Sequence, residues 1–516
     1  STAPATYLDH WILEMGAPYT GQEIGATGYS RELGMCFAFS RGAARQYEKP
    51  WRMYLAVSIQ GGGLGYTEPI YCYLSPECRR RRSYGDTGKF WGEGPYCGTS
   101  LSLQRRQLFV AYMSGVNMIR DENDNHGGGL FYAANYNWRD IDKVDPLVKV
   151  MRDKPYHLSQ AGEIRKELYD NLFKKHDRGV AYTPVGLVFD RHHGFIWTYS
   201  HNKVMGILPY TEGDWMMPAV QSALFPFLVR KDSEARSTGP YGDMFDVLTN
   251  NARQETLRAY RALLLVGDVD LDVRDLADPK RKPYMFAKRL MDYVENGGTL
   301  MINARQIKAG VFPDSFLGCK ITEERGEGQF GYSLPDDEVI KEDKPFKYQR
   351  LEPVTAIPLI LRADTDGKQD ALVTVNKCGK GMVIVTAPDY MMPAGGGERA
   401  MLNMFKHIMG GWRDELLPVK WTGDVEVLVN RNRNGWVVTL VNNEGVIKQA
   451  GQKEEFDAAH DQDVWLRLEK RAGGGQVKNI DEWIKGEKPE MRKTDDGAEV
   501  KITVPAGDIR ILEFHL

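Results

Sequence analysis

The sequence has few of the features that mark several protein classes. Only six cysteines occur in 516 residues, and none forms the Cys-x-x-Cys spacing of a zinc site. No apolar run approaches the roughly 18 residues that a membrane-spanning helix needs. Lys and Arg total 67 against 70 Asp and Glu, whereas nucleic-acid binders carry a basic excess. These absences exclude a disulfide scaffold, a membrane-spanning chain and a nucleic-acid partner.

Motifs for nucleotide cofactors and for serine or cysteine nucleophiles are also missing. No Gly-x-Gly-x-x-Gly follows a predicted strand and no P-loop occurs, so we expect no cofactor. No Gly-x-Ser-x-Gly elbow occurs, and Cys319 and Cys378 stand in turn-like segments without a nearby histidine. We expect no metal site either.

Length and aromatic content indicate which classes of protein fit the remaining features. The chain is long enough for about three domains, and 42% hydrophobic with 27% charged residues is typical of a globular protein. Aromatic residues make up 11%, and their flat faces stack on sugar rings as readily as they fill cores. A large enzyme or a carbohydrate-handling protein fits this composition.

The organisation of the chain predicts three domains. In residues 1–177, short apolar runs predict strands at 11–13, 51–59 and 108–119, with helices at 32–47 and 162–175. Strands that alternate with helices favour a parallel sheet or barrel. In residues 178–415 the same alternation is more regular and predicts a doubly wound sheet. Residues 416–516 contain short runs of partial period-two alternation, which predict an all-β sandwich.

The predicted strands of the second domain come in chain order at 182–189, 245–248, 261–267, 299–303 and 381–387. A helix at 284–295 ends at Asn296-Gly297-Gly298, which is typical of helix termination.

Three segments of this middle region resemble a known family. They are Tyr182-Thr-Pro-Val-Gly-Leu-Val-Phe-Asp190, Ala262-Leu-Leu-Leu-Val-Gly-Asp268 and Val294-Glu-Asn-Gly-Gly-Thr-Leu300. They resemble the trimerisation domain of clan A glycoside hydrolases related to the family 42 β-galactosidases. The resemblance implies a (β/α)8 barrel, a flavodoxin-like domain similar to glutamine amidotransferases, and a C-terminal β domain. It also implies hydrolysis of a carbohydrate substrate by a homo-oligomer, with a trimer favoured.

The first domain departs from this pattern in length. A complete barrel takes about 250 residues, whereas about 177 precede the second domain. The segment 111–119 resembles the closing strand of the family's barrel. We therefore expect residues 1–177 to be the C-terminal part of a barrel whose first half is absent or carried elsewhere, together with the family's acid/base carboxylate.

Glycoside hydrolysis by a barrel needs two carboxylates at the carboxyl ends of strands. Glu14 and Glu122 follow predicted strands, so we expect them to be catalytic. Residues around them, and aromatic rings of the first domain, are expected to bind substrate; they are Trp11, Glu23, Trp51, Trp91, Asp121, Asn123 and His126. As an alternative to catalysis, Glu14 and Glu122 are each a solvated residue or a capping residue. The polar cluster around Glu122 has a second alternative, a Ca²⁺ site.

Two cationic segments have alternatives as well. Arg45 and Gln46 either face a sugar or pack outside the barrel, and their place on a helix that leads into a strand favours packing. The run Arg79-Arg-Arg-Arg82 either binds an acidic or sulfated polysaccharide or is a solvated loop.

The cysteines indicate the cellular compartment in which the protein is expected. Cys78 and Cys97 either form a disulfide, which suits a secreted or periplasmic protein, or are free thiols. The sequence thus predicts an exported glycoside hydrolase, with a non-catalytic carbohydrate-binding or assembly protein built on a barrel relic as the alternative.

Overall fold

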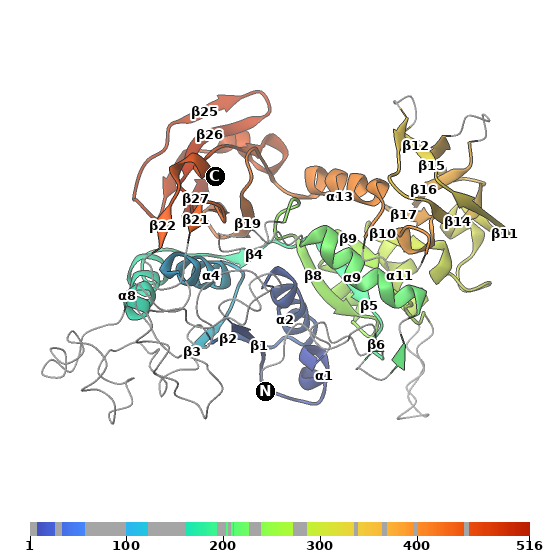
Figure 1. The fold of residues 1–516 in the computed structure, drawn as a ribbon, viewed down its shortest axis with the longest axis horizontal. Helices are drawn as coiled ribbons and strands as arrows, with labels where there is room; N and C mark the ends of the chain where they lie inside the picture. Colours follow the sequence, from blue (N-terminus) through green and yellow to red (C-terminus); the bar gives the residue numbers. More distant parts are fainter. Residues whose placement is uncertain are drawn as a thin grey trace, which may run out of the picture.

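The structure is a computed structural model of the chain (Figure 1). It describes residues 8–25, 33–56, 100–121, 160–192, 203–204, 208–209, 211–225, 239–271, 286–334, 339–363, 369–395, 400–447 and 454–516. No helix in these ranges is long and apolar enough to cross a membrane.

The first part of the chain forms a parallel three-stranded sheet with helical crossovers. The strands β1 (Thr20–Gly25), β2 (Trp51–Ala56) and β3 (Met118–Asp121) lie side by side in chain order. Helix α2 (Leu33–Tyr47) leads from β1 to β2, and α4 (Leu101–Met113) precedes β3. The predicted alternation of strands and helices is confirmed, while a closed barrel stays a prediction.

Two predicted strands of this region are wrong. Residues 11–13 lie in helix α1 (Leu8–Glu14), and the first half of 108–119 lies in α4, with only 118 and 119 in a strand. Ser100 caps α4 by accepting a hydrogen bond from the backbone of Leu103. Because α4 is buried on almost all sides, it carries no amphipathic period, and a short apolar run of this kind reads equally as a buried strand.

The predicted helices of the first part are confirmed. Residues 32–47 correspond to α2, and residues 162–175 to α8 (Gln160–Glu167), which continues into the π-helical turn η2 (Leu168–Phe173).

The middle of the chain forms a large mixed sheet with five parallel strands in the order β8-β5-β9-β10-β17. They are β5 (Val185–Phe189), β8 (Phe245–Thr249), β9 (Ala262–Leu265), β10 (Thr299–Asn303) and β17 (Gly381–Thr386). All five coincide with predicted strands. Each is buried almost throughout, so helices cover this sheet and its strands read as continuous apolar runs.

Antiparallel strands extend the sheet beyond β17. They are β11 (Cys319–Gly328), β12 (Gly331–Ser333), β13 (Ile340–Lys341), β14 (Phe346–Pro353), β15 (Ile357–Ala363) and β16 (Ala371–Cys378). The helices of this part are α9 (Glu212–Leu224), α10 (Gln254–Arg258), α11 (Phe286–Glu295), α12 (Asp314–Leu317) and α13 (Asn403–Leu416).

The C-terminal part forms two antiparallel sheets, as predicted. One has the order β18 (Val419–Trp421), β23 (Gln462–Glu469), β26 (Gly497–Val504), β25 (Met491–Thr494). The other has the order β24 (Asn479–Glu482), β27 (Ile509–His515), β20 (Gly435–Val441), β19 (Glu426–Arg431), β4 (Val180–Ala181). Because β4 comes from the segment before β5, the second sheet of the sandwich includes residues far apart in sequence.

Short elements complete the described structure. Two small antiparallel pairs are β6 (Lys203–Val204) with β7 (Leu208–Pro209) and β21 (Val446–Ile447) with β22 (Glu455–Phe456). Single 3₁₀ turns are η3 (Ala304–Gln306), η4 (Asp389–Met391), η5 (Ala458–His460), η6 (Lys470–Ala472) and η7 (Gly474–Gln476).

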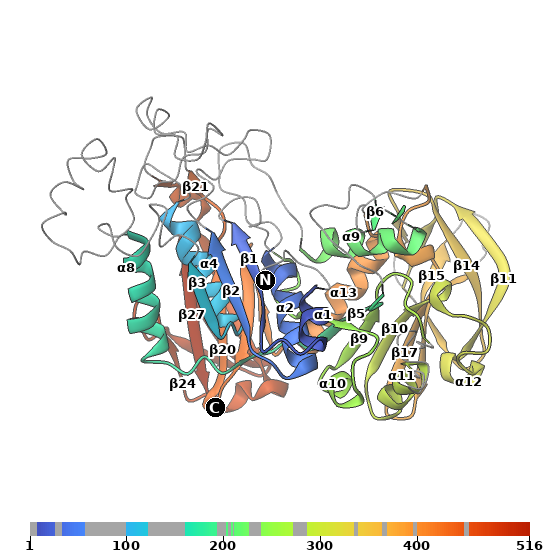
Figure 2. The same ribbon diagram turned by 90° about the horizontal axis from the view of Figure 1, so that it is seen from below.

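The first sheet and the sandwich occupy one half of the molecule, with the large sheet in the other half (Figure 2). One hydrophobic core joins the first sheet and its helices to the sandwich. It contains Phe37 of α2, Phe109 of α4 and Leu172 of η2 together with Val437 of β20 and Ile511 of β27. Helix α2 also packs along β8 of the large sheet. It therefore sits at the junction of all three parts.

Candidate functional site

The strands of the first sheet have one face against helices and one polar face. Trp51 and Met53 of β2 point toward α2 and α4, and the ring of Trp51 lies edge-on to that of Phe37 at 5.4 Å. Both side chains are buried, with Trp51 only 3% exposed. Since successive side chains of a strand alternate between faces, Arg52 and Tyr54 point the other way.

The polar face combines guanidinium groups with aromatic rings. We define it by Tyr19, Arg52, Tyr54 and Arg120. The guanidinium of Arg52 lies 4.8 Å from the ring centre of Tyr19, and that of Arg120 lies 5.6 Å from that of Tyr54. Both contacts are in the range of cation–π attraction. Such pairs hold flat aromatic and guanidinium surfaces in fixed orientations.

Backbone register aligns Tyr54 with one residue on each neighbouring strand. Glu23 of β1 is paired with Tyr54 of β2, and Tyr54 is paired with Arg120 of β3. The three residues therefore form one row across the sheet, in the carboxyl-terminal halves of three parallel strands. Asp121 pairs with Leu55, one position further along. Glu23 and Asp121 are among the predicted substrate-binding residues, whereas Tyr54 and Arg120 are not; the alternation of Trp51-Arg52-Met53-Tyr54 is a local signal for the orientation of Tyr54 alone.

Glu14 and Trp11 lie elsewhere. Both are in α1, so the prediction that they end a strand is wrong. The Glu14 carboxylate pairs with Arg191 at 2.6 Å, and the Trp11 indole donates to the backbone oxygen of Arg191 at 3.0 Å. Arg191 follows β5 of the large sheet. These two contacts attach α1 to the large sheet, and the carboxylate of Glu14 is paired with a cation.

Other predicted site residues fall outside the described ranges. These are Glu122, Trp91, Asn123 and His126, together with Cys78, Cys97 and the run Arg79–Arg82. The carboxylate separation between Glu14 and Glu122, the disulfide and the Ca²⁺ alternative therefore stay predictions. Among the described cysteines, Cys319 and Cys378 are free thiols. Within the described ranges, no group of three or more His, Cys, Asp and Glu is placed to hold a metal ion.

The cationic residues of α2 pack against the large sheet. Arg45 pairs with Asp246 of β8 at 2.6 Å, and Gln46 donates to Thr249 at 2.8 Å and to Asn251 at 3.0 Å. Both side chains therefore pack against the large sheet, the role that their place on the helix favours. Burial opposes ionisation of Asp246, but the nearby guanidinium groups outweigh it and lower the pKa of this carboxyl.

Comparison with known proteins shows which solved structures share the fold of this chain. No model of a known protein family matches the sequence, and no curated protein matches it. Solved structures do match. An α-L-fucosidase, isoenzyme 2 from Paenibacillus thiaminolyticus, has a TM-score of 0.55 at 13% identity, over 97% of this chain and 66% of that one. A catalytic mutant of a GH42 β-galactosidase from G. stearothermophilus has a TM-score of 0.53 at 11% identity, over 96% and 60%.

A third match is a cold-adapted β-galactosidase from Rahnella sp. R3, with a TM-score of 0.51 at 12% identity, over 98% of this chain and 61% of that one. At such identity the likeness is one of fold. The chain spans 60 to 66% of the length of these three enzymes. Its fold is thus a mixed α/β arrangement shared, over nearly its whole length, with glycoside hydrolases.

Proposed function

We propose that this chain acts as a glycoside hydrolase on a poly- or oligosaccharide by two-carboxylate catalysis. The observation that carries the proposal is the row of Glu23, Tyr54 and Arg120 across three parallel strands, in a fold shared with β-galactosidases and a fucosidase. In this proposal the first sheet is part of a (β/α)8-type barrel. The large sheet, with its order β8-β5-β9-β10-β17, is a flavodoxin-like domain.

The position of the row suits barrel chemistry. Catalytic residues of barrels come from the carboxyl ends of strands, which is the half of β1 and β2 where Glu23 and Tyr54 lie. Neighbouring strands are about 4.8 Å apart, so residues on β1 and β3 are separated by roughly 10 Å. Paired carboxylates in glycosidases lie roughly 5 to 9.5 Å apart, so the spacing of these two strands suits the proposal.

We assign the pair to Glu23 and Glu122 rather than to Glu14 and Glu122. Glu14 is paired with Arg191 and holds α1 to the large sheet. Glu122 directly follows β3 in the sequence. In this proposal Glu23, in one row with Arg120, serves as the nucleophile or base. Glu122 would then supply the acid that protonates the leaving oxygen.

Tyr54 and Arg120 would bind the sugar in this arrangement. A tyrosine ring stacks on the apolar face of a pyranose, while a guanidinium donates to ring hydroxyls in a fixed geometry. Because Arg120 already lies over the Tyr54 ring, the two groups are held in place before substrate arrives.

The test is hydrolysis of a panel of nitrophenyl glycosides, including β-galactoside and α-fucoside, by the full chain. We expect Glu23→Gln and Glu122→Gln each to lower kcat about a thousandfold or more, as removal of a catalytic group does. The matched control is Glu14→Gln, which should keep kcat within about twofold. A panel that the unmodified chain does not hydrolyse at all would reject the hydrolase.

A second candidate function is a non-catalytic carbohydrate-binding or assembly protein. It is favoured by the polar face itself, because its described groups are two guanidinium–tyrosine pairs, which bind without catalysing. This alternative predicts that an oligosaccharide binds, that Tyr54→Ala lowers its affinity about tenfold, and that the bound sugar is recovered intact. Recovery of cleaved products would reject it.

Assembly and export are further parts of the proposal. A trimer would be checked by light scattering of the purified chain after size-exclusion chromatography. A Cys78–Cys97 disulfide, which would support a secreted or periplasmic protein, would be checked by peptide mapping with and without reductant.

A further inference from the structure

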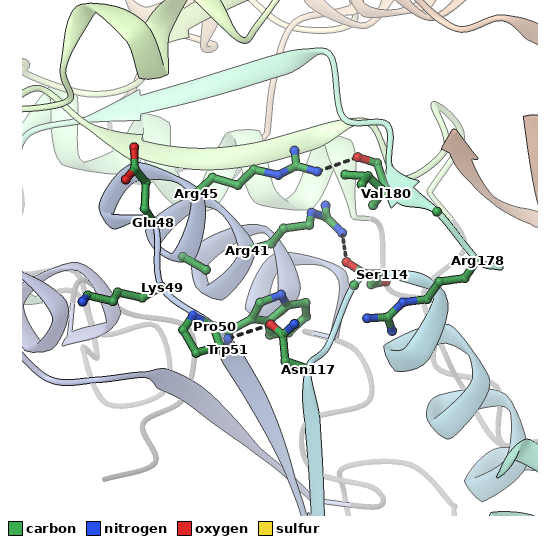
Figure 3. Close-up of a pocket in the computed structure, with 14 residues that line it drawn as sticks. Arg41, Arg45, Glu48, Lys49, Pro50, Trp51, Ser114, Asn117, Arg178 and Val180 are labelled. Carbon is green, nitrogen blue, oxygen red and sulfur yellow. Dashed lines mark hydrogen bonds between the residues drawn. The ribbon is translucent and has the colours of Figure 1, made fainter. Parts of the chain in front are cut away.

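A cavity of about 480 Å³ lies where the three parts of the chain meet (Figure 3). Its walls come from the end of α2, the start of β2, the segment after α4, and the segment that leads into β4. Trp51, the first residue of β2, lines it. The cavity is therefore at the amino ends of the parallel strands, away from the row that contains Tyr54.

The charge of the lining is predominantly positive. Arg41, Arg45, Lys49 and Arg178 line the cavity, against a single described carboxylate, that of Glu48. Glu48 extends from the far side of the cavity relative to Arg178 (Figure 3). A cavity with this lining attracts anions.

Two of these cations are neutralised by the large sheet. Arg41 donates to Asp243 and Asp246, and Arg45 also donates to Asp246. Their charges are balanced by the two aspartates, so they contribute little net attraction. Excess positive charge then rests with Arg178 and Lys49.

Arg178 is held rigidly without an acidic partner. Its guanidinium lies 4.4 Å from the ring centre of Tyr112 and donates through Nη1 to the backbone oxygen of the same residue. In the described part of the chain no carboxylate lies within ion-pair distance of it. Burial lowers the pKa of Arg178, which remains protonated at neutral pH. The N–H groups that do not face Tyr112 are therefore oriented in advance for an acceptor.

Ser114 gives independent evidence that a polar ligand belongs here. It caps the end of α4, is fully buried and lines the cavity. Its hydroxyl has no hydrogen-bond partner in the described structure. Arg41 and Arg178 approach Ser114 from opposite sides (Figure 3). A buried hydroxyl without a partner is unfavourable, and a ligand oxygen would satisfy it.

Asn117 supplies one more donor. Its side-chain oxygen accepts a hydrogen bond from the backbone of Trp51 at 3.1 Å, so its orientation is fixed and its amide NH₂ points away from that contact. The cavity thus offers a guanidinium, a hydroxyl and an amide, all of which donate hydrogen bonds.

We propose that this cavity binds a phosphate or sulfate group through Arg178, Ser114 and Asn117. A guanidinium fork matches two oxygens of such an anion. The volume of about 480 Å³ lies within the range of small-molecule pockets, so the anion is accommodated either free or as a substituent of a sugar. The proposal does not depend on hydrolysis at the polar face.

The test is calorimetric titration of the full chain with inorganic phosphate and with sulfate, in a chloride buffer of constant ionic strength. A third titration with a hexose 6-phosphate separates the two sources of the group. Tighter binding of the sugar phosphate would identify a phosphorylated sugar as the ligand, and equal binding would identify the free anion. We expect saturable binding of at least one of these probes at one site per chain.

Variants test the assignment of the groups. Arg178→Gln should raise the Kd at least tenfold, and Ser114→Ala several-fold. The matched control is Arg433→Gln, because Arg433 is a nearby, largely exposed arginine 3.9 Å from Asp177 and outside the cavity lining. It should bind as the unmodified chain does. Ser114→Ala removes a hydroxyl without a partner, so it should fold normally and keeps the test valid if Arg178→Gln does not fold.

Two results would overturn the proposal. One is binding of phosphate, sulfate and hexose 6-phosphate no tighter than chloride. The other is an equal loss of affinity in Arg433→Gln and Arg178→Gln, which would indicate general charge attraction rather than a site.

Discussion

Arg41 of α2 and Asp246 of β8 form a buried ion pair, with Nε and Oδ1 2.6 Å apart. Asp246 also accepts hydrogen bonds from Arg45 at 2.6 Å and from Thr183 and Tyr260 at 2.9 Å each. Its carboxylate is therefore fully satisfied although it is 0% exposed. This single carboxylate attaches the helical layer of the first sheet to the edge strand of the large sheet.

Removal of the Asp246 charge should destabilise the protein strongly. Asp246→Asn leaves the buried Arg41 and the partly buried Arg45 short of a counter-ion, and loss of one partner of a buried pair typically costs about 3 to 5 kcal/mol. Urea unfolding followed by circular dichroism would measure this loss. Asp463→Asn, which removes an exposed carboxylate paired with Lys501, is the control and should leave the unfolding midpoint unchanged.

His10 should make the protein less stable in mild acid. Burial lowers the pKa of this histidine to about 4, outweighing its hydrogen bond with the backbone oxygen of Val247. The unfolded chain takes up the proton near pH 6.5 and the folded chain only near pH 4, so stability falls as pH drops through that window. The expected loss is about 3 kcal/mol. His10→Gln should flatten this part of the stability profile, and an unchanged slope would contradict the assignment.

Asp246 should produce a separate effect at lower pH. Its folded pKa is lowered below that of the unfolded chain, so its stabilisation is present above about pH 4 and is lost as the pH falls further. Unfolding free energies measured from pH 7 to pH 2 would show two acid limbs in the unmodified chain. The lower limb should weaken in Asp246→Asn, while the upper limb stays.

Trp51 should matter for stability through packing. Its side chain is 3% exposed against Phe37, and truncation of such a core residue costs about 3 to 5 kcal/mol. Trp51→Ala should therefore lower the thermal midpoint by many degrees. Trp465→Ala is a matched control, since this tryptophan of the sandwich is 47% exposed and its loss should shift the midpoint little.

Glu14→Gln should weaken the attachment of α1. The Glu14–Arg191 pair is partly exposed, and pairs of that kind contribute about 1 kcal/mol or less. Proteolysis near the N-terminus should accelerate modestly in this variant, with global unfolding little changed. Glu255→Gln, a carboxylate on α10 that forms no ion pair among the described residues, should show neither effect.

The strands of the large sheet were predictable because they lie in apolar runs bounded by turn residues. The segment around Leu263 and the one around Ile302 are buried on both faces, and such strands need no knowledge of distant residues. The helix α4 was not predictable by this logic. Its residues from Leu108 onward are apolar on all sides because α4 is enclosed between the first sheet and the sandwich.

The residues of the candidate site also fall into two groups, those that were expected from the sequence and those that only the fold brings together. Glu23 was expected to bind substrate and lies in β1, while Tyr54 and Arg120 are brought together only by a register that joins residues 66 positions apart. Glu14 was misplaced because its ion pair with Arg191 spans 177 positions in the chain. Neither relationship leaves a local signal in composition or period.

The sequence by itself determined the five parallel strands of the large sheet, the helices at 32–47 and 162–175, and the short strands of the third part. Only the tertiary structure decided which polar groups meet: the row through Glu23, the Glu14–Arg191 pair, and the cationic cavity at Ser114. The physical reason is the distance along the chain over which each kind of interaction acts. Hydrophobic period and turn chemistry act over a few residues, whereas ion pairs, register and cavities arise between segments that only the folded chain brings together.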